Sequence, residues 1–310
     1  MAWNFFKYCS SLRIFGSLMI LLVAAIIGVT YYAVIVTTYG PQLFHGGFEA
    51  IVAFLIIVVF HLLLVMLIWC YFRVVLTDPG GVPSNWRPMI DEEDLEANTM
   101  TMSATLPPSS NVVNYPQPLV SSAAQVPGLR YCNKCENYKP PRCHHCRVCQ
   151  RCILKMDHHC VWVVNCVGAR NYKFFLLFLI YTFLETTLDT IVLLPHFINF
   201  FKDAENHSSS SSNLATTFLA FILNVAFALS LLGFLILHTS LVMANTTTIE
   251  VYEKKKSSRW RYDMGRMKNF EQVFGTRKLY WLIPLYAEED IANMPMLHGL
   301  DFPIRPDVEE

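Results

Sequence analysis

Four apolar stretches, each long enough to cross a lipid bilayer, constrain the fold of this chain more than any other feature. They run from about Leu12 to Val36, Glu49 to Val75, Phe174 to Phe200 and Leu214 to Ala244. A hydrocarbon core about 30 Å thick needs roughly 20 apolar residues per helix. With 54% hydrophobic and only 15% charged residues, the chain is too apolar for a soluble domain. The sequence predicts an all-α integral membrane protein with four transmembrane helices.

The distribution of Lys and Arg predicts the orientation of these helices. The segment from Thr37 to Phe48 has no basic residue, and the segment from Phe201 to Asn213 has only Lys202. The central segment from Leu76 to Lys173 and the tail from Asn245 each carry about ten. Because basic loops stay preferentially in the cytosol, both termini and the central segment are expected there.

The remaining composition divides the chain into five parts. Residues 90–128 are rich in Ser, Pro and acids, which is typical of a disordered linker. The expected parts are helices 1 and 2 with a short lumenal loop (1–76), a cytosolic turn and linker (77–128), a cysteine-rich domain (129–173), helices 3 and 4 (174–244) and a cytosolic tail (245–310).

The cysteine-rich segment points to bound metal. Eight of the ten cysteines and four of the ten histidines fall within residues 129–171. Cytosolic cysteines stay reduced, which favours metal ligation over disulfides. Tetrahedral zinc takes four Cys or His ligands, often as closely spaced pairs, such as Cys132 with Cys135 and Cys146 with Cys149. Two zinc ions need eight ligands, and the spacing alone does not say which four residues stay free.

An iron–sulfur cluster is the alternative, because Cys143, Cys146, Cys149 and Cys152 form an unbroken CxxCxxCxxC. The bacterial ferredoxin run has three residues before its last cysteine and a proline after it. Here two residues precede Cys152 and Ile153 follows it. The interleaved histidines also suit zinc better, so two structural zinc ions are the prediction.

Several different short motifs are spread along nearly the whole chain. They are Asp78-Pro79-Gly80, His145-Cys146, Asp157-His158-His159-Cys160, Cys166-Val167-Gly168, Asn171-Tyr172, Thr247-Thr248-Ile249-Glu250, and NFEQVFG from Asn269 to Gly275. With them the chain resembles the DHHC-type protein S-acyltransferases, or palmitoyltransferases, and in particular plant members. Two of these motifs look like the family's TTxE and NxxxxFG elements. The resemblance implies a cytosolic double-zinc domain between helices 2 and 3.

The family pattern also implies the two sets of zinc ligands. One ion would be bound by Cys132, Cys135, His145 and Cys152, and the other by Cys146, Cys149, His159 and Cys166. Cys143, His144, His158 and Cys160 would remain free. Cys143 is expected to be a packed or free thiol, with secondary acylation or competition for zinc as alternatives.

Asp157, His158 and Cys160 supply the three roles of nucleophilic catalysis. A cysteine needs a base to become thiolate, and the base is best held by a third group. We expect Cys160 to take the acyl group from palmitoyl-CoA or another long-chain acyl-CoA and pass it to cysteines of membrane-associated client proteins. By resemblance, Thr248 would hydrogen-bond Asp157, and Asn269 would cap or brace the site.

The acyl-CoA should contact both the spans and the cytosolic face. Trp162, Phe175 and Phe178 are expected to line the mouth of a chain pocket within the spans, although interfacial belt residues explain the two phenylalanines equally well. Position and resemblance suggest that phosphates contact Arg130, Lys139, Arg142 and His144. Basic residues near a bilayer also face anionic lipid.

Glu185 and Asp189 are four residues apart in the third span. Glu185 is expected near the bilayer centre, where placing an ionisable group costs free energy and usually indicates a function. Glu185 is expected to close the deep end of the acyl cavity and influence chain length, with a helix-packing hydrogen bond as the alternative. Its expected partner is His61 or a hydroxyl group from Tyr31, Tyr32 or Thr186.

Two substitutions depart from the common family sequence DHHCPWVNNC, since Val161 replaces Pro and Val164 replaces the first Asn. Similar changes occur in plant members, so activity is still expected. The alternative functions are a membrane-anchored zinc-finger ubiquitin ligase or adaptor and a zinc-handling membrane protein. No nucleic acid partner is expected. The expected location is the Golgi or another endomembrane, with the plasma membrane as the alternative.

Overall fold

The computed structural model describes residues 10–84, 86–87, 130–206, 211–253 and 260–305. Within them, four helices are long and apolar enough to cross a membrane, at Leu18–Gln42, Gly47–Leu76, Tyr172–Asn199 and Ala215–Met243. The chain is therefore a multi-pass membrane protein with four spans. The first span lies somewhat later in the chain than expected, and the other three agree closely. The linker expected at residues 90–128 lies outside the described residues.

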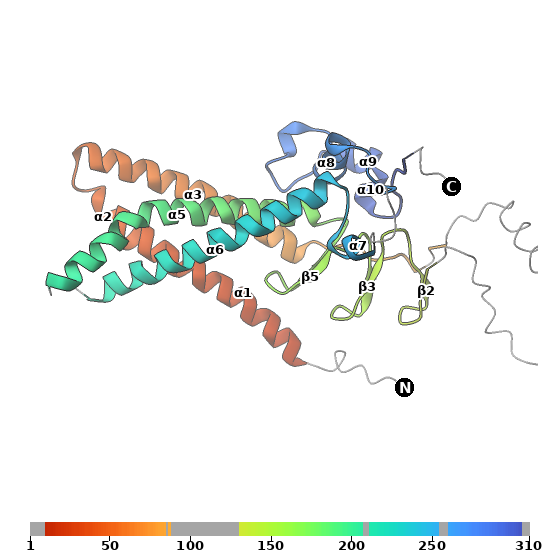
Figure 1. The fold of residues 1–310 in the computed structure, drawn as a ribbon, viewed down its shortest axis with the longest axis horizontal. Coiled ribbons are helices and arrows are strands. Elements are labelled where there is room, and N and C mark those ends of the chain that lie inside the picture. The colour runs from red at the N-terminus through yellow and green to blue at the C-terminus, as the bar shows by residue number, and fades with distance from the viewer. Residues whose placement is uncertain (1–9, 85, 88–129, 207–210, 254–259, 306–310) are drawn as a thin grey trace, which may run out of the picture.

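The four spans form a bundle that makes up one end of the molecule (Figure 1). Helix α1 (Ser10–Tyr31) continues through a π-helical segment, η1 (Tyr32–Tyr39), into α2 (Gly40–Gln42), and α3 (Gly47–Leu76) returns. The other two helices are α5 (Tyr172–Asn206) and α6 (Ser211–Met243). Helix α5 packs against both α3 and α6. A helix satisfies its own backbone hydrogen bonds, which is why such apolar sequences cross lipid in this form.

The cysteine-rich segment forms three short antiparallel hairpins rather than one sheet. Strand β1 (Tyr131–Cys132) pairs with β2 (Asn137–Tyr138), β3 (His144–Cys146) with β4 (Arg151–Ile153), and β5 (His158–Cys160) with β6 (Asn165–Val167). Strands this short are not stable alone in water. The hairpins therefore depend on what is bound between them and on the helices they contact.

The third hairpin is fixed to the C-terminal end of α3 and to the bundle. Asn165 donates hydrogen bonds to the backbone oxygens of Val74 and Thr77, at 3.0 and 2.9 Å. Cys160 and Val163 belong to the same buried apolar cluster as residues of α3, α5 and α6. The Asp78-Pro79-Gly80 turn bonds to the second hairpin, where Leu154 N donates to Gly80 O at 2.9 Å.

The tail lies beside the hairpins at the same end of the bundle (Figure 1). It contains α7 (Thr248–Glu253), α8 (Arg266–Phe274), η3 (Lys278–Tyr280), α9 (Glu288–Asn293) and α10 (Pro295–His298). Asn269 on α8 is fully buried and donates to Met243 O at 2.7 Å. It therefore braces the end of α6.

Candidate active site and metal centres

The structure gathers two groups of three cysteines and one histidine. They are Cys132, Cys135, His145 and Cys152, and Cys146, Cys149, His159 and Cys166. The two groups interleave along the chain, because Cys152 on β4 belongs to the first group and follows Cys146 and Cys149, which belong to the second. These are the two sets that the family pattern implies, and both could hold a metal ion.

The spacing of the donor atoms fits tetrahedral zinc. Bonds of about 2.0–2.3 Å place the ligand atoms of such a site roughly 3.3–3.8 Å apart. In the first group the Nδ1 atom of His145 lies 3.6, 3.2 and 3.9 Å from the sulfurs of Cys132, Cys135 and Cys152. In the second group the Nδ1 atom of His159 lies 3.8, 3.4 and 3.5 Å from those of Cys146, Cys149 and Cys166. The donor set and its geometry therefore fit the expected ion.

The same geometry does not support an iron–sulfur cluster on the CxxCxxCxxC run. Cys152 belongs to one group, Cys146 and Cys149 belong to the other, and Cys143 belongs to neither. Cys143 is fully buried in a cluster with Leu154 and Cys152. It is a packed thiol that lies outside both metal groups.

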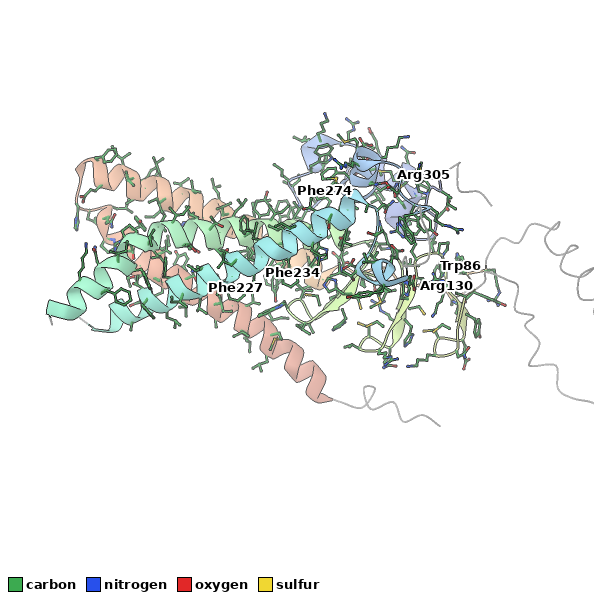
Figure 2. The ribbon with its side chains drawn as sticks, in the orientation of Figure 1. Trp86, Arg130, Phe227, Phe234, Phe274 and Arg305 are labelled. Atoms are coloured by element: carbon green, nitrogen blue, oxygen red, sulfur yellow. The ribbon has the colours of Figure 1, made fainter. Side chains whose placement is uncertain are left out.

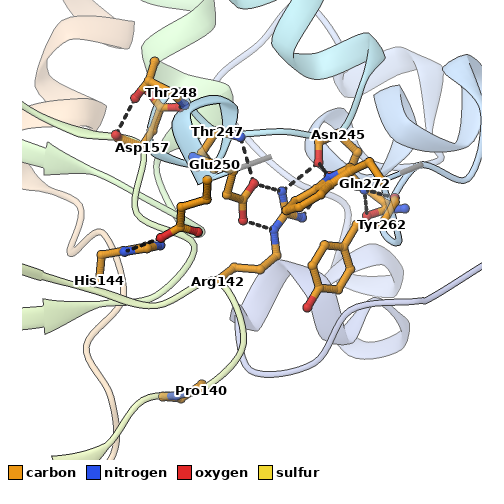
Figure 3. Close-up of polar contacts among 12 residues, drawn as sticks. Pro140, Arg142, His144, Asp157, Asn245, Thr247, Thr248, Glu250, Tyr262 and Gln272 are labelled. Carbon is orange, nitrogen blue, oxygen red and sulfur yellow. Dashed lines mark hydrogen bonds and ion pairs between the residues drawn. The ribbon is translucent and has the colours of Figure 1, made fainter. Parts of the chain in front are cut away.

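Strand β5 and the residue before it place Asp157, His158 and Cys160 together beside the spans. His158 Nδ1 lies 2.6 Å from Asp157 Oδ2. Thr248 donates from its backbone nitrogen to Asp157 Oδ1 at 2.9 Å and from its hydroxyl to Asp157 O at 2.6 Å. The structure thus contains the hydrogen bond expected between Thr248 and Asp157 (Figure 3). His159 points away from Cys160 and into the second metal group.

The electrostatics of these residues favour a thiolate and an imidazolium. Burial lowers the pKa of His158, but its hydrogen bonds and charge interactions with Asp157 and Cys160 raise that pKa to about 9. Burial raises the pKa of the Cys160 thiol, whereas the hydrogen bond and charge of His158 and the backbone N–H groups of Val163 and Trp162 lower it below its ordinary value. Cys160 is therefore prepared to act as a nucleophile.

A cavity of about 390 Å³ extends from Cys160 into the bundle. Trp162, Phe175 and Phe178, the three aromatic residues expected at its mouth, all line it. Phe227 and Phe234 line it from α6, along which Figure 2 labels them. The lining as a whole is mostly apolar, which suits a hydrocarbon chain.

The deep part of the cavity contains polar groups. Its lining includes Glu185, Asp189 and Asn224. The carboxyl oxygens of Glu185 and Asp189 are buried and have no hydrogen-bond partner among the described residues. The partner expected for Glu185 is therefore wrong. His61 bonds instead to Ile57 O at 2.7 Å and lies 3.4 Å from the Tyr31 hydroxyl.

The other two hydroxyl groups considered for Glu185 are not its partners either. Thr186 donates to Thr182 O at 2.9 Å, within its own helix. Half of the side chain of Tyr32 is exposed on the outside of the bundle, at 44%. Thr186 is not a partner of Glu185 because a Thr hydroxyl in a helix readily bonds to the carbonyl one turn earlier.

Three of the four residues expected to contact phosphates lie near one another. Arg130 is exposed, and Lys139 and His144 are half-buried. Burial lowers the pKa of His144, Glu253 raises it, and the charges of Arg130 and Lys139 lower it further. Figure 2 labels Arg130 at the end of the cysteine-rich region that faces away from the spans.

The phosphate contact expected for Arg142 is wrong. Its side chain is 3% exposed and donates to both carboxylate oxygens of Glu250 at 2.7 Å (Figure 3). It also donates to Asn245 and lies over the rings of Tyr262 and Phe302. Its donors are thus engaged within the protein. Arg142 joins the second hairpin to the tail, and it is not presented to a phosphate in solution.

One further residue, His238, reaches the site and was not suggested by the sequence. His238 on α6 is 2% exposed, lines the cavity and has its Nδ1 atom 3.1 Å from the Tyr172 hydroxyl. A nitrogen of His238, a nitrogen of His158 and an oxygen of Asp157 all lie within 4.8 Å of one another. The sequence signal for His238 was a histidine near the C-terminal end of an apolar span, a few turns before the TTxE motif.

Comparisons with known proteins agree with this site. Residues 125–255 match the family model described as DHHC palmitoyltransferase. The chain is 59% identical over 309 residues to "Probable protein S-acyltransferase 14" of Arabidopsis thaliana, covering 100% of this chain and 97% of that protein. It is 32% identical over 307 residues to "Palmitoyltransferase ZDHHC20" of Homo sapiens, covering 98% and 80% of the two chains.

Proposed function

The chain belongs to the DHHC palmitoyltransferase family and is a protein S-acyltransferase, and we propose that Cys160 carries the acyl group from an acyl-CoA donor to a cysteine of a client protein. One observation carries this assignment. The Cys160 side chain borders an apolar cavity within the spans, and the His158–Asp157 pair lies beside it. A nucleophile, its base and a chain-binding pocket therefore meet at one point.

In the first stage the Cys160 thiolate attacks the thioester carbon of a long-chain acyl-CoA. The proton of Cys160 resides on His158, whose other ring nitrogen is held by Asp157. The carbon–sulfur bond to CoA breaks, and the departing CoA sulfur takes the proton from His158. The products are free CoA and an acyl thioester on Cys160.

In the second stage a client cysteine attacks that thioester. His158 accepts the proton of the incoming thiol, a new thioester forms on the client, and Cys160 leaves as a thiolate. The bonds broken and formed are of the same kind, so the protein contributes orientation and thiolate supply rather than driving force. Ping-pong kinetics follow from the covalent intermediate.

Two zinc ions are proposed as the occupants of the two Cys₃His groups. When bound, they would supply folding energy to hairpins too short to be stable alone. The second group includes His159, which lies between His158 and Cys160 in β5. Fixing His159 would therefore fix its two neighbours on the strand.

The cavity is proposed to hold the acyl chain, with Trp162, Phe175 and Phe178 near the thioester. Each buried methylene contributes about 0.8 kcal/mol, which favours long chains such as palmitoyl. Glu185, at the polar end of the lining, is proposed to limit how far the chain extends. Arg130, Lys139 and His144 are proposed to contact the phosphates of CoA, because Arg130 and Lys139 lie close enough to His144 for their charges to lower its pKa.

The remaining features of the proposal concern placement in the membrane. Both termini and the cysteine-rich region are proposed to face the cytosol, because the basic residues concentrate there. The parts of the chain are then 1–76, 77–128, 129–173, 174–244 and 245–310. The clients would be membrane-associated proteins with cytosolic cysteines, on the Golgi or another endomembrane.

Acylation of the purified protein tests the proposal. The wild type, Cys160→Ser and the matched control Cys143→Ser are incubated with labelled palmitoyl-CoA, and hydroxylamine-sensitive label and zinc content are measured. Label is expected on the wild type and Cys143→Ser, and at least 100-fold less on Cys160→Ser. Zinc should stay near two ions per chain in all three, because neither cysteine is in a metal group.

Two outcomes would overturn the assignment. Label that persists on Cys160→Ser would place the acyl group on another residue. A zinc-loaded wild type without label would favour the adaptor function and would direct attention to Val161 and Val164.

A further inference from the structure

The imidazole of His158 is enclosed by two other rings. Its centroid lies 5.1 Å from that of Phe175 and 5.9 Å from that of His238. The Phe175 and His238 rings are themselves 5.3 Å apart, edge to face. The three rings therefore contact one another pairwise, and two of them come from helices α5 and α6 rather than from the hairpin that carries His158.

His238 is itself held in one orientation. Its Nδ1 atom lies 3.1 Å from the hydroxyl of Tyr172, and both side chains are buried, at 2% and 6% exposed. Tyr172 begins α5 directly after Asn171, which accepts a hydrogen bond from Gly168 N at 2.9 Å. The orientation of His238 is thus tied to the turn that follows β6.

Asp157 alone does not fix the base. The hydrogen bond at 2.6 Å holds Nδ1 of His158, but an imidazole can still swing about that contact. The nitrogens of His158 and His238 and the carboxylate of Asp157 lie within 4.8 Å of one another, so the His238 ring occupies the space into which the base would swing. Removing that ring would leave His158 free to turn away from Cys160.

We infer that His238, anchored by Tyr172, is a positioning residue that keeps the His158 imidazole directed at Cys160. This inference rests on the proposed function, because it assigns a role toward the base of that reaction. His238 itself touches neither the transferred carbon nor the Cys160 sulfur in this reaction scheme. Its effect should therefore appear in the rate of acyl transfer and not in the binding of the acyl donor.

The test is the saturation kinetics of Cys160 acylation by palmitoyl-CoA in His238→Ala, with the neighbouring, exposed Thr239→Ala as the matched control. A displacement of about 1 Å at a reacting group can lower a rate by about 100-fold. For His238→Ala we expect kcat to fall 10- to 100-fold, with KM within about twofold of the wild type. Thr239→Ala should resemble the wild type in both constants.

A second variant examines the anchor. Tyr172→Phe removes a single oxygen and should lower kcat by a few-fold. The double variant His238→Ala/Tyr172→Phe should be no slower than His238→Ala, since Tyr172 acts through His238. If His238→Ala fails to retain two zinc ions, His238→Asn, which keeps an acceptor near the position of Nδ1, replaces it in the comparison with Tyr172→Phe.

Several results would overturn the inference while leaving the proposed function intact. The first is a wild-type kcat for a zinc-loaded His238→Ala. The second is a raised KM with unchanged kcat, which would make His238 only part of the wall of the acyl cavity. The third is full additivity of His238→Ala and Tyr172→Phe. A wild type that is never acylated would instead remove the proposed function.

Discussion

Buried carboxyl groups occur in two regions of this protein, and the hydrogen bonds that they accept differ between the two regions. Asp157 and Glu250, beside the hairpins, are 1% and 2% exposed, while Glu185 and Asp189, within α5, are 5% and 0% exposed. Glu250 receives two hydrogen bonds from Arg142 and one from Thr247 N. The carboxyls in α5 receive none from the described residues. Similar burial therefore accompanies opposite degrees of hydrogen bonding.

The difference follows from the backbone around each region. The hairpins and the tail are irregular, so they offer free N–H groups and long basic side chains that can converge on a carboxylate. Within the spans the backbone N–H groups are already bonded inside their helices, and only side chains are left to act as donors. A buried carboxyl thus joins distant segments near the hairpins, whereas in the bundle it lines a cavity.

The largest expected effect comes from breaking the satisfied pair. Glu250→Ala leaves the Arg142 guanidinium buried at 3% exposure without its carboxylate. Removing one partner of a buried ion pair costs about 3–5 kcal/mol. We expect a loss of that size in the free energy of unfolding, measured by chemical denaturation in detergent, together with easier release of zinc to a chelator.

The matched control for this change is Glu253→Ala on the same short helix. The Glu253 side chain is 52% exposed and lies 3.8 Å from His144, and exposed pairs contribute little. Its loss should stay below about 1 kcal/mol. Equal effects of Glu250→Ala and Glu253→Ala would show that the buried network does not hold the hairpin to the tail.

The next effect comes from replacing an unsatisfied carboxyl. Glu185→Leu removes two buried oxygens that have no hydrogen-bond partner among the described residues, and such a group carries a penalty of about 1–3 kcal/mol. We expect stability to rise by up to that amount rather than fall. The apolar end should also favour longer acyl chains, measured as the ratio of label from 18-carbon and 16-carbon acyl-CoA.

Because the readout is a ratio within one variant, it does not depend on the fraction of folded enzyme. Leu184→Ala serves as the control, since the neighbouring Leu184 is exposed on the outside of the bundle, at 42%. An unchanged ratio in a folded Glu185→Leu protein would remove the role proposed for Glu185. A clear loss of stability would indicate that Glu185 has a partner after all.

The sequence predicted bound metal from its closely spaced Cys and His residues, whereas the family resemblance, and not the spacing, implied which residues are ligands and which are catalytic. The two metal groups are built from residues within a few dozen positions, and Asp157, His158 and Cys160 are nearly consecutive. The four spans were predicted because each is a single run of apolar residues whose length is set by the bilayer. For the spans, and for metal binding as such, one local physical requirement determines the pattern.

Contacts between distant positions were not predictable in this way. Arg142 was interpreted as a phosphate contact because a basic residue near the site suits an anion, and nothing in its neighbourhood indicates Glu250. His238 appears as one polar residue in an apolar helix, since its relation to His158 depends on how α6 packs against the hairpin. Both interactions are long-range products of packing, for which a single sequence has no periodic signal.

The smallest expected effect concerns backbone strain in the hairpin that carries Cys160. Val164, in the turn between β5 and β6, has a φ of 52°, a left-handed conformation that is unfavourable for a β-branched residue. Asn adopts this conformation more readily because its side chain can bond to the local backbone, so Val164→Asn should raise the free energy of unfolding by about 1 kcal/mol. Val161→Asn makes the same change in the same turn without a positive φ and should give no gain. Equal effects of the two changes would mean that polarity, rather than strain, limits the hairpin. A gain confined to Val164 would mean that bound metal and packing, and not a relaxed backbone, hold the nucleophile in place.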